Sequence, residues 1–267
     1  MTSRLDWADR IWKDPDGGAI HLHGTLPTVV HPEKLRPRID WDGLAILATD
    51  EEAELWEQEE KDEREDEGIN LDSALLAGGL DSVMLDRLMM LSEIQAGRFP
   101  DPEPRRLHRA ALRHNRPIFF IEPGADTDED WSEHLSEEAK SMTTLRKLLS
   151  TIRTPRKFDK AVRRIKVELV DPPRPVNEQM GVASVLCAAW WRVGESRRGP
   201  QISAARDARF AARLRGALAE LRKSNGKNAT LLVPIFQDWR DDIVTALSNA
   251  DVEEVSSSSA SSSEEEE

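Results

Sequence analysis

The clearest pattern in the chain is a series of short apolar runs bounded by glycine, proline or acidic residues, which predicts buried strands. These runs lie within residues 17–30, 44–48, 116–122 and 230–236. Longer segments with apolar residues at helical spacing separate or follow them, at residues 105–114, 176–193, 202–223 and 241–247. Because helices and strands alternate over short connections, we expect one α/β domain with a mainly parallel sheet flanked by helices.

Three further segments complete the expected organisation. Residues 1–16 carry Trp7, Ile11 and Trp12 at helical spacing, which indicates an N-terminal amphipathic arm before a turn. Residues 73–90 are strongly apolar and are expected to be helical in their second half. Residues 256–267 are almost entirely serine and glutamate and are expected to form a disordered tail, because they cannot bury an apolar face. The single domain then spans residues 17–255.

Composition narrows the class of protein. The chain has 267 residues, of which 39% are hydrophobic and 33% charged, which suits one globular domain. No apolar run approaches the ~20 residues of a membrane span, and the N-terminus lacks a signal-peptide core. Cys187 is the single cysteine, which excludes an internal disulfide framework and a cysteine-built zinc site. We therefore expect a cytoplasmic protein without a membrane span.

Charge is distributed unevenly along the chain. The net charge of −13 comes mainly from an acidic segment at residues 50–67 and from the four terminal glutamates. The acidic segment has few apolar residues and is expected to be a mobile, solvated helix or loop inserted in the domain. A basic stripe follows at residues 146–166. It could dock the acidic segment, be solvated, or bind a phosphate backbone; because it lacks interleaved aromatic residues, nucleic acid is not the expected partner.

Two histidines in the first apolar run are the first candidates for chemistry. His21 and His23 lie two positions apart, so on a strand they share one face. Neutral imidazoles suit zinc or manganese, but we favour the alternative of two partly buried, hydrogen-bonded histidines. The pair also resembles the His-x-His of metal-dependent amidohydrolases, which need further histidines at strand ends. The remaining histidines fall in predicted loops or helices: His31, His108, His114 and His134.

The order of elements resembles the TraB/PrgY family of α/β proteins. Residues 24–27 (Gly-Thr-Leu-Pro) stand where that family has Gly-Thr-x-His, and residues 44–48 match its second strand. Residues 105–121 match its middle helix and strand, residues 205–211 its late Arg-Asp helix, and residues 231–237 its closing strand. The resemblance covers roughly residues 17–255 and implies a fold built around a metallohydrolase site.

The departures from the family pattern fall on the residues expected to do chemistry. The motif histidine is replaced by Pro27, the motif glutamate by Ala48 or Thr49, and the closing histidine by Gln237. Proline cannot bind a metal or transfer a proton, and glutamine is a poor ligand. We therefore expect a degenerate site without metal or other cofactor, in a non-catalytic binding or regulatory protein whose partner is an unknown protein or small molecule. The expected cleft residues are His21, His23, Thr25, Asp50, Glu122, Arg206, Gln237 and Asp238.

Two enzymatic alternatives stay open. Residues 77–82 (Ala-Gly-Gly-Leu-Asp-Ser) are similar to the Ser-Gly-Gly-x-Asp-Ser loop of ATP pyrophosphatases, which cradles a pyrophosphate at a helix start after a strand. This resemblance implies ATP binding, and the strand-like residues 74–76 precede the loop. We favour a Gly-Gly kink within a helical hairpin instead. The other alternative is a hydrolase with a divalent metal site rebuilt on His21, His23 and Asp50. The nucleotide-binding residues in the ATP alternative are Gly78, Gly79, Asp81 and Ser82.

Overall fold

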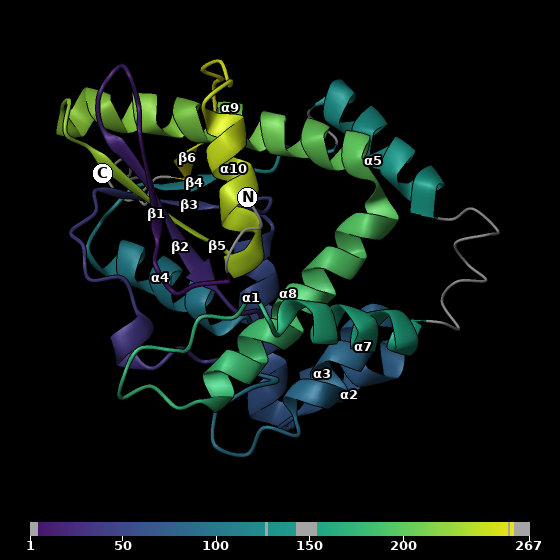
Figure 1. Cartoon of the computed structure of the whole chain (residues 1–267). Coiled ribbons are helices and arrows are strands. Elements are labelled where there is room, and N and C mark those ends of the chain that lie inside the picture. Colours follow the sequence, from purple (N-terminus) through teal and green to yellow (C-terminus); the bar gives the residue numbers. More distant parts are fainter. Residues whose placement is uncertain (1–4, 126–127, 143–153, 256, 259–267) are drawn as a thin grey trace.

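The protein is a helix-covered sheet, described by a computed structural model at residues 5–125, 128–142, 154–255 and 257–258. The described residues form a six-stranded sheet in the order β1-β2-β5-β3-β4-β6 (Figure 1). The inner strands β2, β5, β3 and β4 run parallel, and β1 and β6 pair antiparallel at the edges. The strands are β1 (Arg10–Lys13), β2 (Ala19–Thr25), β3 (Gly43–Ile46), β4 (Ile118–Phe120), β5 (Thr230–Phe236) and β6 (Ser257–Ser258).

Helices cover both faces of this sheet because the inner strands are apolar on both sides. The helices are α1 (Glu52–Glu65), α2 (Ile69–Ala77), α3 (Gly79–Leu88), α4 (Pro102–Arg113), α5 (Glu129–Met142), α7 (Thr154–Ile165), α8 (Gln179–Arg198), α9 (Pro200–Asn225) and α10 (Arg240–Leu247), with 3-10 turns η1 (Glu33–Leu35) and η3 (Gln237–Trp239). Leu231 of β5 packs in a core cluster with α9 and α10, whereas the next residue, Leu232, packs in a cluster with α4. This alternation along one strand assigns α9 and α10 to one face and α4 to the other.

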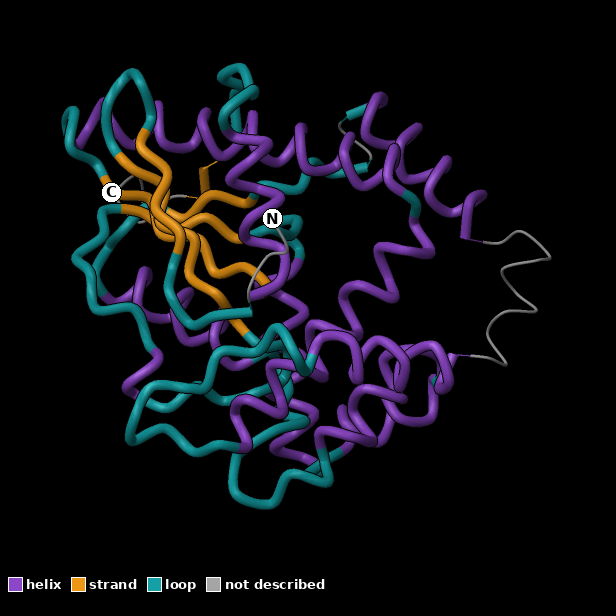
Figure 2. The backbone as a smooth tube through the Cα atoms, in the orientation of Figure 1, coloured by secondary structure: helices purple, strands orange, loops and turns teal. Residues whose placement is uncertain are grey.

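A second layer of helices lies beside the sheet. Helices α2, α3, α7 and α8 share their own apolar core, which includes Met84, Phe158 and Val185. Figure 2 shows these helices grouped apart from the strands, with α8 leading from them toward α9. The polar side chains described below lie where this helical layer meets the carboxyl ends of the parallel strands.

Most of the predicted elements, and the α/β class itself, are confirmed. The four predicted strands correspond to β2, β3, β4 and β5, and the four predicted helices to α4, α8, α9 and α10. No helix among the described residues is both long and apolar enough to cross a membrane.

The prediction of an amphipathic helical arm at residues 1–16 is wrong in its described part. Residues 10–13 form strand β1, which pairs with β2 in a register that joins Trp12 to Ile20. Trp12 packs against the core of the sheet, while Ile11 is 59% exposed. The helical spacing rested on three apolar residues, a number that an edge strand with one inward tryptophan fits equally well.

Residues 74–76, which the ATP pyrophosphatase alternative took as strand-like, belong to α2, in line with the helical hairpin that we favoured. Gly78 and Gly79 have positive φ angles of 73° and 83° and turn the chain directly into α3. The structure therefore shows a Gly-Gly kink in a helical hairpin. The strand that the ATP pyrophosphatase resemblance requires before its loop is absent from these residues.

The acidic segment was expected to be a solvated helix or loop, and it forms helix α1. One side of this helix packs against the rest of the protein. Trp56 of α1 is 3% exposed and packs edge-on against His108 of α4. Glu60 pairs with Arg105 at 2.7 Å and with Arg109 at 2.6 Å. The described ion pairs of this segment are with α4, so docking on the basic stripe, one of the alternatives for that stripe, is not the arrangement found. Its expected mobility stays a prediction.

The expected C-terminal tail falls mostly outside the described residues. Ser257 and Ser258 are described and form β6 against β4, so these two residues are ordered by strand pairing. Residues 256 and 259–267 lie outside the described part of the chain.

Candidate functional site

The carboxyl edge of the sheet brings together residues that are far apart in the sequence. Strands β2 and β5 pair in a register that aligns their last residues, Thr25 and Phe236. The residues that follow them, Pro27 and Gln237, line the same small cavity of about 10 Å³, together with Thr25 and Asp238. Three of the predicted cleft residues, Thr25, Gln237 and Asp238, thus meet at one point.

Both the oxygen and the nitrogen of the Gln237 side-chain amide form hydrogen bonds at this edge. Ser184 Oγ donates a hydrogen bond to Gln237 Oε1 at 2.5 Å, and Gln237 Nε2 donates to the carbonyl of Asp6 at 2.6 Å. Because both side-chain groups are bonded and the residue is buried, Gln237 holds neighbouring segments together.

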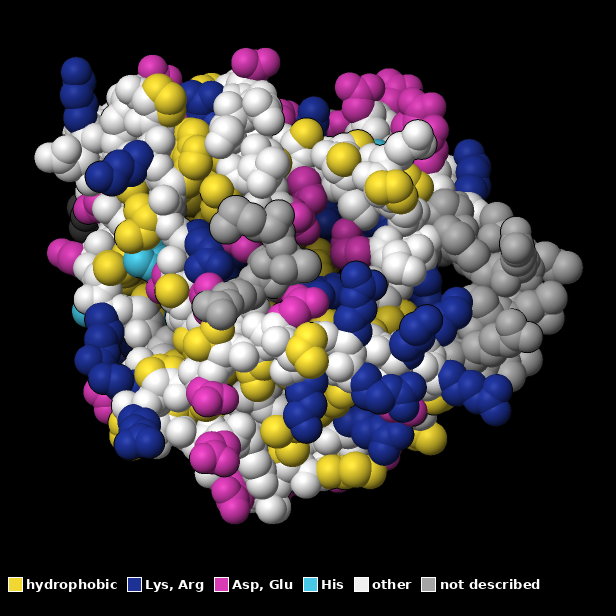
Figure 3. Space-filling model, viewed as in Figure 1, with side chains coloured by type: hydrophobic (Ala, Val, Ile, Leu, Met, Phe, Trp, Pro, Cys, Tyr) yellow, Lys and Arg dark blue, Asp and Glu magenta, His cyan; other side chains and the backbone are white. Residues whose placement is uncertain are grey.

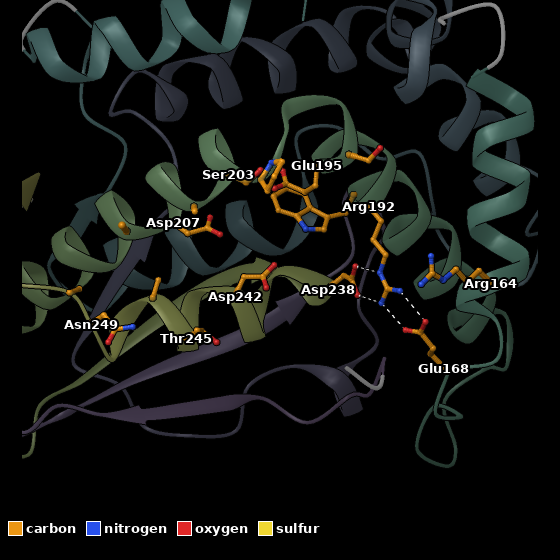
Figure 4. Close-up of a pocket in the computed structure, with 17 residues that line it drawn as sticks. Arg164, Glu168, Arg192, Glu195, Ser203, Asp207, Asp238, Asp242, Thr245 and Asn249 are labelled. Carbon is orange, nitrogen blue, oxygen red and sulfur yellow. Dashed lines mark hydrogen bonds and ion pairs between the residues drawn. The ribbon is translucent and has the colours of Figure 1, made fainter. Parts of the chain in front are cut away.

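A larger cleft of about 870 Å³ opens beside this cavity, between α8, α9 and α10. Figure 4 shows carboxylates from all three helices and from the turn before α10 pointing into it, with Trp191 among the lining residues. The acidic lining residues are Glu168, Glu195, Asp207, Asp238 and Asp242. Carboxylates converging in one cleft favour a positively charged occupant.

Arginine side chains form ion pairs with four of these five carboxylates. Arg192 donates to Asp238 at 2.6 Å and to Glu168 at 2.9 Å, the two bridges drawn in Figure 4. Arg206, a predicted cleft residue, is 6% exposed and pairs with Glu195 and Asp207.

Arg206 lies against two tryptophan rings that also contact each other. Its guanidinium carbon lies 5.1 Å from the ring centroid of Trp191 and 4.3 Å from that of Trp239. The Trp239 indole N–H also donates to Asp207 at 2.9 Å. The ring contacts hold the Arg206 guanidinium, and the indole N–H holds the Asp207 carboxylate, in fixed positions at this corner of the cleft.

Asp242 is the exception among the cleft carboxylates. Among the described residues, no group donates a hydrogen bond to Asp242 or forms an ion pair with it. Desolvation in the cleft, together with the negative charges of Asp207 and Asp238, raises the pKa of Asp242 to about 6. The cleft therefore contains one carboxylate whose charge is not compensated.

The two histidines of β2 lie away from this cleft. His21 and His23 are both buried and share Asp9: His21 Nε2 lies 2.7 Å from one carboxylate oxygen, and His23 Nδ1 lies 3.0 Å from the other. Burial opposes ionisation, but the hydrogen bonds from both rings outweigh it and hold the pKa of Asp9 well below its usual range. His21 and His23 are thus a buried pair that is hydrogen-bonded to one carboxylate, which is the alternative that the sequence analysis favoured.

Two more buried polar residues, His31 and Glu103, lie close to His23. One potential ligand atom from each of His23, His31 and Glu103 lies within 4.8 Å of the others, and all three residues are at most 2% exposed. Burial lowers the pKa of His31 to about 4, so its ring is neutral at pH 7. Burial opposes ionisation of Glu103, but the hydrogen bond from Arg106 prevails and lowers its pKa.

Sequence reasoning missed three members of this buried group. Asp9 was assigned to a helix, Glu103 lay in a proline-rich connection, and His31 was dismissed as a loop residue. One available signal was the position of His31, which follows β2 directly, in the loop type that carries sites in open α/β sheets.

The remaining predicted site residues are dispersed. Asp50 is exposed before α1, and Glu122 follows β4, where burial raises its pKa. Neither lines the large cleft. Gly78, Gly79, Asp81 and Ser82 lie in the α2–α3 hairpin, where Asp81 accepts a hydrogen bond from the indole N–H of Trp190 at 2.5 Å.

The basic stripe forms a separate surface. Figure 3 shows Lys and Arg side chains gathered over the region where Figure 1 places α7. Lys157, Lys160 and Arg164 line a second hollow of about 390 Å³ and form no ion pair among the described residues. Arg164 also lines the acidic cleft, so the two hollows adjoin. Arg146, Lys147 and Arg153 lie outside the described residues.

Comparison of the chain with protein families, with curated proteins and with solved structures finds no match.

Proposed function

We propose that this chain is a non-catalytic, TraB-like binding protein whose cleft between α8, α9 and α10 takes a small ligand with an ammonium or guanidinium group. The observation that carries the proposal is Asp242, a carboxylate in the cleft with no cation of its own among the described residues. A bound cation relieves the repulsion between Asp242 and its neighbours, Asp207 and Asp238.

The rest of the cleft supports a cationic ligand. The other lining carboxylates have arginine partners that fix their positions. Five carboxylates nevertheless stand against Arg164, Arg192 and Arg206, so the cleft keeps an excess of negative charge. Trp191 adds apolar surface for the carbon chain of the ligand. Asp242 is then the direct anchor, and the paired carboxylates set the sign of the charge that is accepted.

The residues at the strand ends support binding without catalysis. In the TraB/PrgY pattern histidines stand at the positions of Pro27 and Gln237, and neither replacement moves a proton at neutral pH. The oxygen and the nitrogen of the Gln237 amide moreover each hold a hydrogen bond, to Ser184 and to the Asp6 carbonyl, which ties this side chain into the fold.

Substitution of Asp242 by asparagine tests the proposal. With spermidine as the cationic probe, at low ionic strength, we expect saturable binding by the unmodified protein and binding at least about 10-fold weaker by Asp242→Asn, a difference of ~1.4 kcal/mol. Isothermal titration calorimetry measures both. Asp86→Asn is the matched control, because it removes the same charge from an exposed position on α3. Equal affinities of the two variants, or no saturable binding by the unmodified protein, would contradict the proposal.

The pH dependence of binding follows from the pKa of Asp242. Below pH 6 its carboxyl group is protonated and neutral, so spermidine affinity should rise between pH 5 and pH 7 and then level off. Spermidine itself keeps its charge over this range. Titrations at constant ionic strength should show the rise in the unmodified protein and not in Asp242→Asn. A pH-independent affinity would remove Asp242 from the site.

A further inference from the structure

The buried polar group at the end of β2 has features that the cleft proposal does not use. His23 lies on β2, His31 in the loop that follows it, and Glu103 in the first turn of α4. Three segments separated by up to 80 positions thus direct a nitrogen or oxygen ligand atom at one point in the interior. Such convergence requires compensation, because buried polar atoms without partners are costly.

Two ring nitrogens in this group lack partners. His23 Nε2 and His31 Nδ1 are buried and have no hydrogen-bond partner among the described residues. The rings themselves lie edge to face with centroids 5.9 Å apart. Two imidazole nitrogens left open next to a carboxylate are what a metal ion would satisfy.

The hydrogen bonds of His23 prepare its nitrogen for a metal. Asp9 accepts from Nδ1, so the proton of the neutral ring is placed there and the lone pair is left on Nε2. His21 binds the other oxygen of Asp9 and fixes the carboxylate. A carboxylate behind a ligand histidine is the usual outer support of a protein zinc site.

From this geometry we propose a buried divalent-cation site, suited to Zn²⁺, with His23 and His31 and Glu103 as ligands and Asp9 as the outer support. Two imidazoles and one carboxylate are a zinc donor set and leave one position for water. Ligation through His31 Nδ1 moves the ring proton to Nε2, which then gives up a 3.3 Å contact with the Leu26 N–H. When Glu103 binds the ion, the Arg106 side chain, which is 30% exposed, gives up its ion pair with Glu103 and turns toward solvent.

The proposed ion has a structural role. It joins β2, the 26–31 loop and the start of α4, across a loop in which Thr28 has an unfavourable φ of 59°. The ligands are closed to solvent, and none lines the acidic cleft. The site is therefore independent of the cleft proposal, and Asp242→Asn should leave the metal content unchanged.

Metal analysis of the full chain tests the site. We expect about one Zn²⁺ per chain after addition of zinc and dialysis, and a higher melting temperature with zinc than after treatment with EDTA. His23→Gln and Glu103→Gln should lose the bound zinc. Asp9→Asn should weaken it by ~10–100-fold, because it removes only the outer support. His114→Gln, on the surface, and His108→Gln, buried elsewhere, are the controls and should keep it.

A second measurement keeps the proposal falsifiable if a variant fails to fold. Titration of unmodified protein with zinc should shift the imidazole ¹⁵N signals of His23 and His31 and leave those of His108 and His114 in place. No zinc bound at 1:1 in the unmodified protein, or loss of zinc in a control variant alone, would overturn the site.

Discussion

Replacement of Arg240 by methionine is expected to lower the free energy of unfolding by about 3–5 kcal/mol, because it removes one side of a buried polar network. Arg240 is 2% exposed, and its guanidinium donates to three backbone carbonyls: those of Gln237, Ala8 and Asp6. Methionine fills a similar volume but removes all three of these charged donors. The Gln237 carbonyl loses its Arg240 partner, whereas the carbonyls of Asp6 and Ala8 keep one donor each, from Gln237 Nε2 and Arg10. The segment before β1 would lose one of its attachments to the turn that follows β5.

Urea unfolding measures the loss. Arg163→Met is the matched control, because Arg163 is exposed on α7, and it should change the free energy of unfolding by no more than about 0.5 kcal/mol. Arg240→Lys should recover little, since an ammonium cannot reach three carbonyls with the planar fork of a guanidinium. A loss below about 1 kcal/mol in Arg240→Met would show that water replaces the guanidinium at this point.

The role of Arg240 illustrates what the sequence leaves open. In the sequence it is one more charged residue before a short amphipathic helix. Its importance depends on Gly24 of β2, where a Cβ would lie 2.9 Å from the guanidinium, and on carbonyls more than 230 positions away. Backbone acceptors carry no residue-type signal, so a site built on them is invisible before the chain is folded.

The parts that could be predicted are those in which local pattern and tertiary burial agree. The runs that became β3 and β5 are apolar on both faces, and only a covered, inner strand satisfies such a run. Glycine at position 226 ends α9 in a positive-φ conformation, as its place after a periodic segment indicates. For each of these elements, the residues of the element itself and its end are enough to predict the structure.

The parts that were missed depend on contacts between distant segments. Strand β1 is stabilised by pairing with β2, and helical spacing in so short a segment carries little information. The acidic helix α1 lies against α4, where its one buried residue, Trp56, packs on His108. The buried group formed by His23, His31 and Glu103 needed the positions of three segments at once.

Replacement of Arg206 by methionine should separate stability from binding. Arg206 is buried against Trp191 and Trp239 and pairs with both Glu195 and Asp207, so its loss is expected to cost about 3 kcal/mol of unfolding free energy. The same change leaves Asp207 in the cleft wall without a cation and leaves Glu195 with Arg198 alone. Spermidine affinity at pH 8 should therefore increase several-fold, although the protein itself is less stable.

The gain should shrink as the pH falls. Arg206 lowers the pKa of Asp242, so its removal raises that pKa further and protonates the anchor at a higher pH. Calorimetric titrations at pH 6 and pH 8 measure the difference. Arg206→Met combined with Asp207→Asn is the matched variant, and it should recover part of the stability and lose part of the added affinity, because one unpaired charge is gone. A loss of stability with no gain in affinity would mean that the wall carboxylates do not face the bound cation, and Asp242 would then have to act alone.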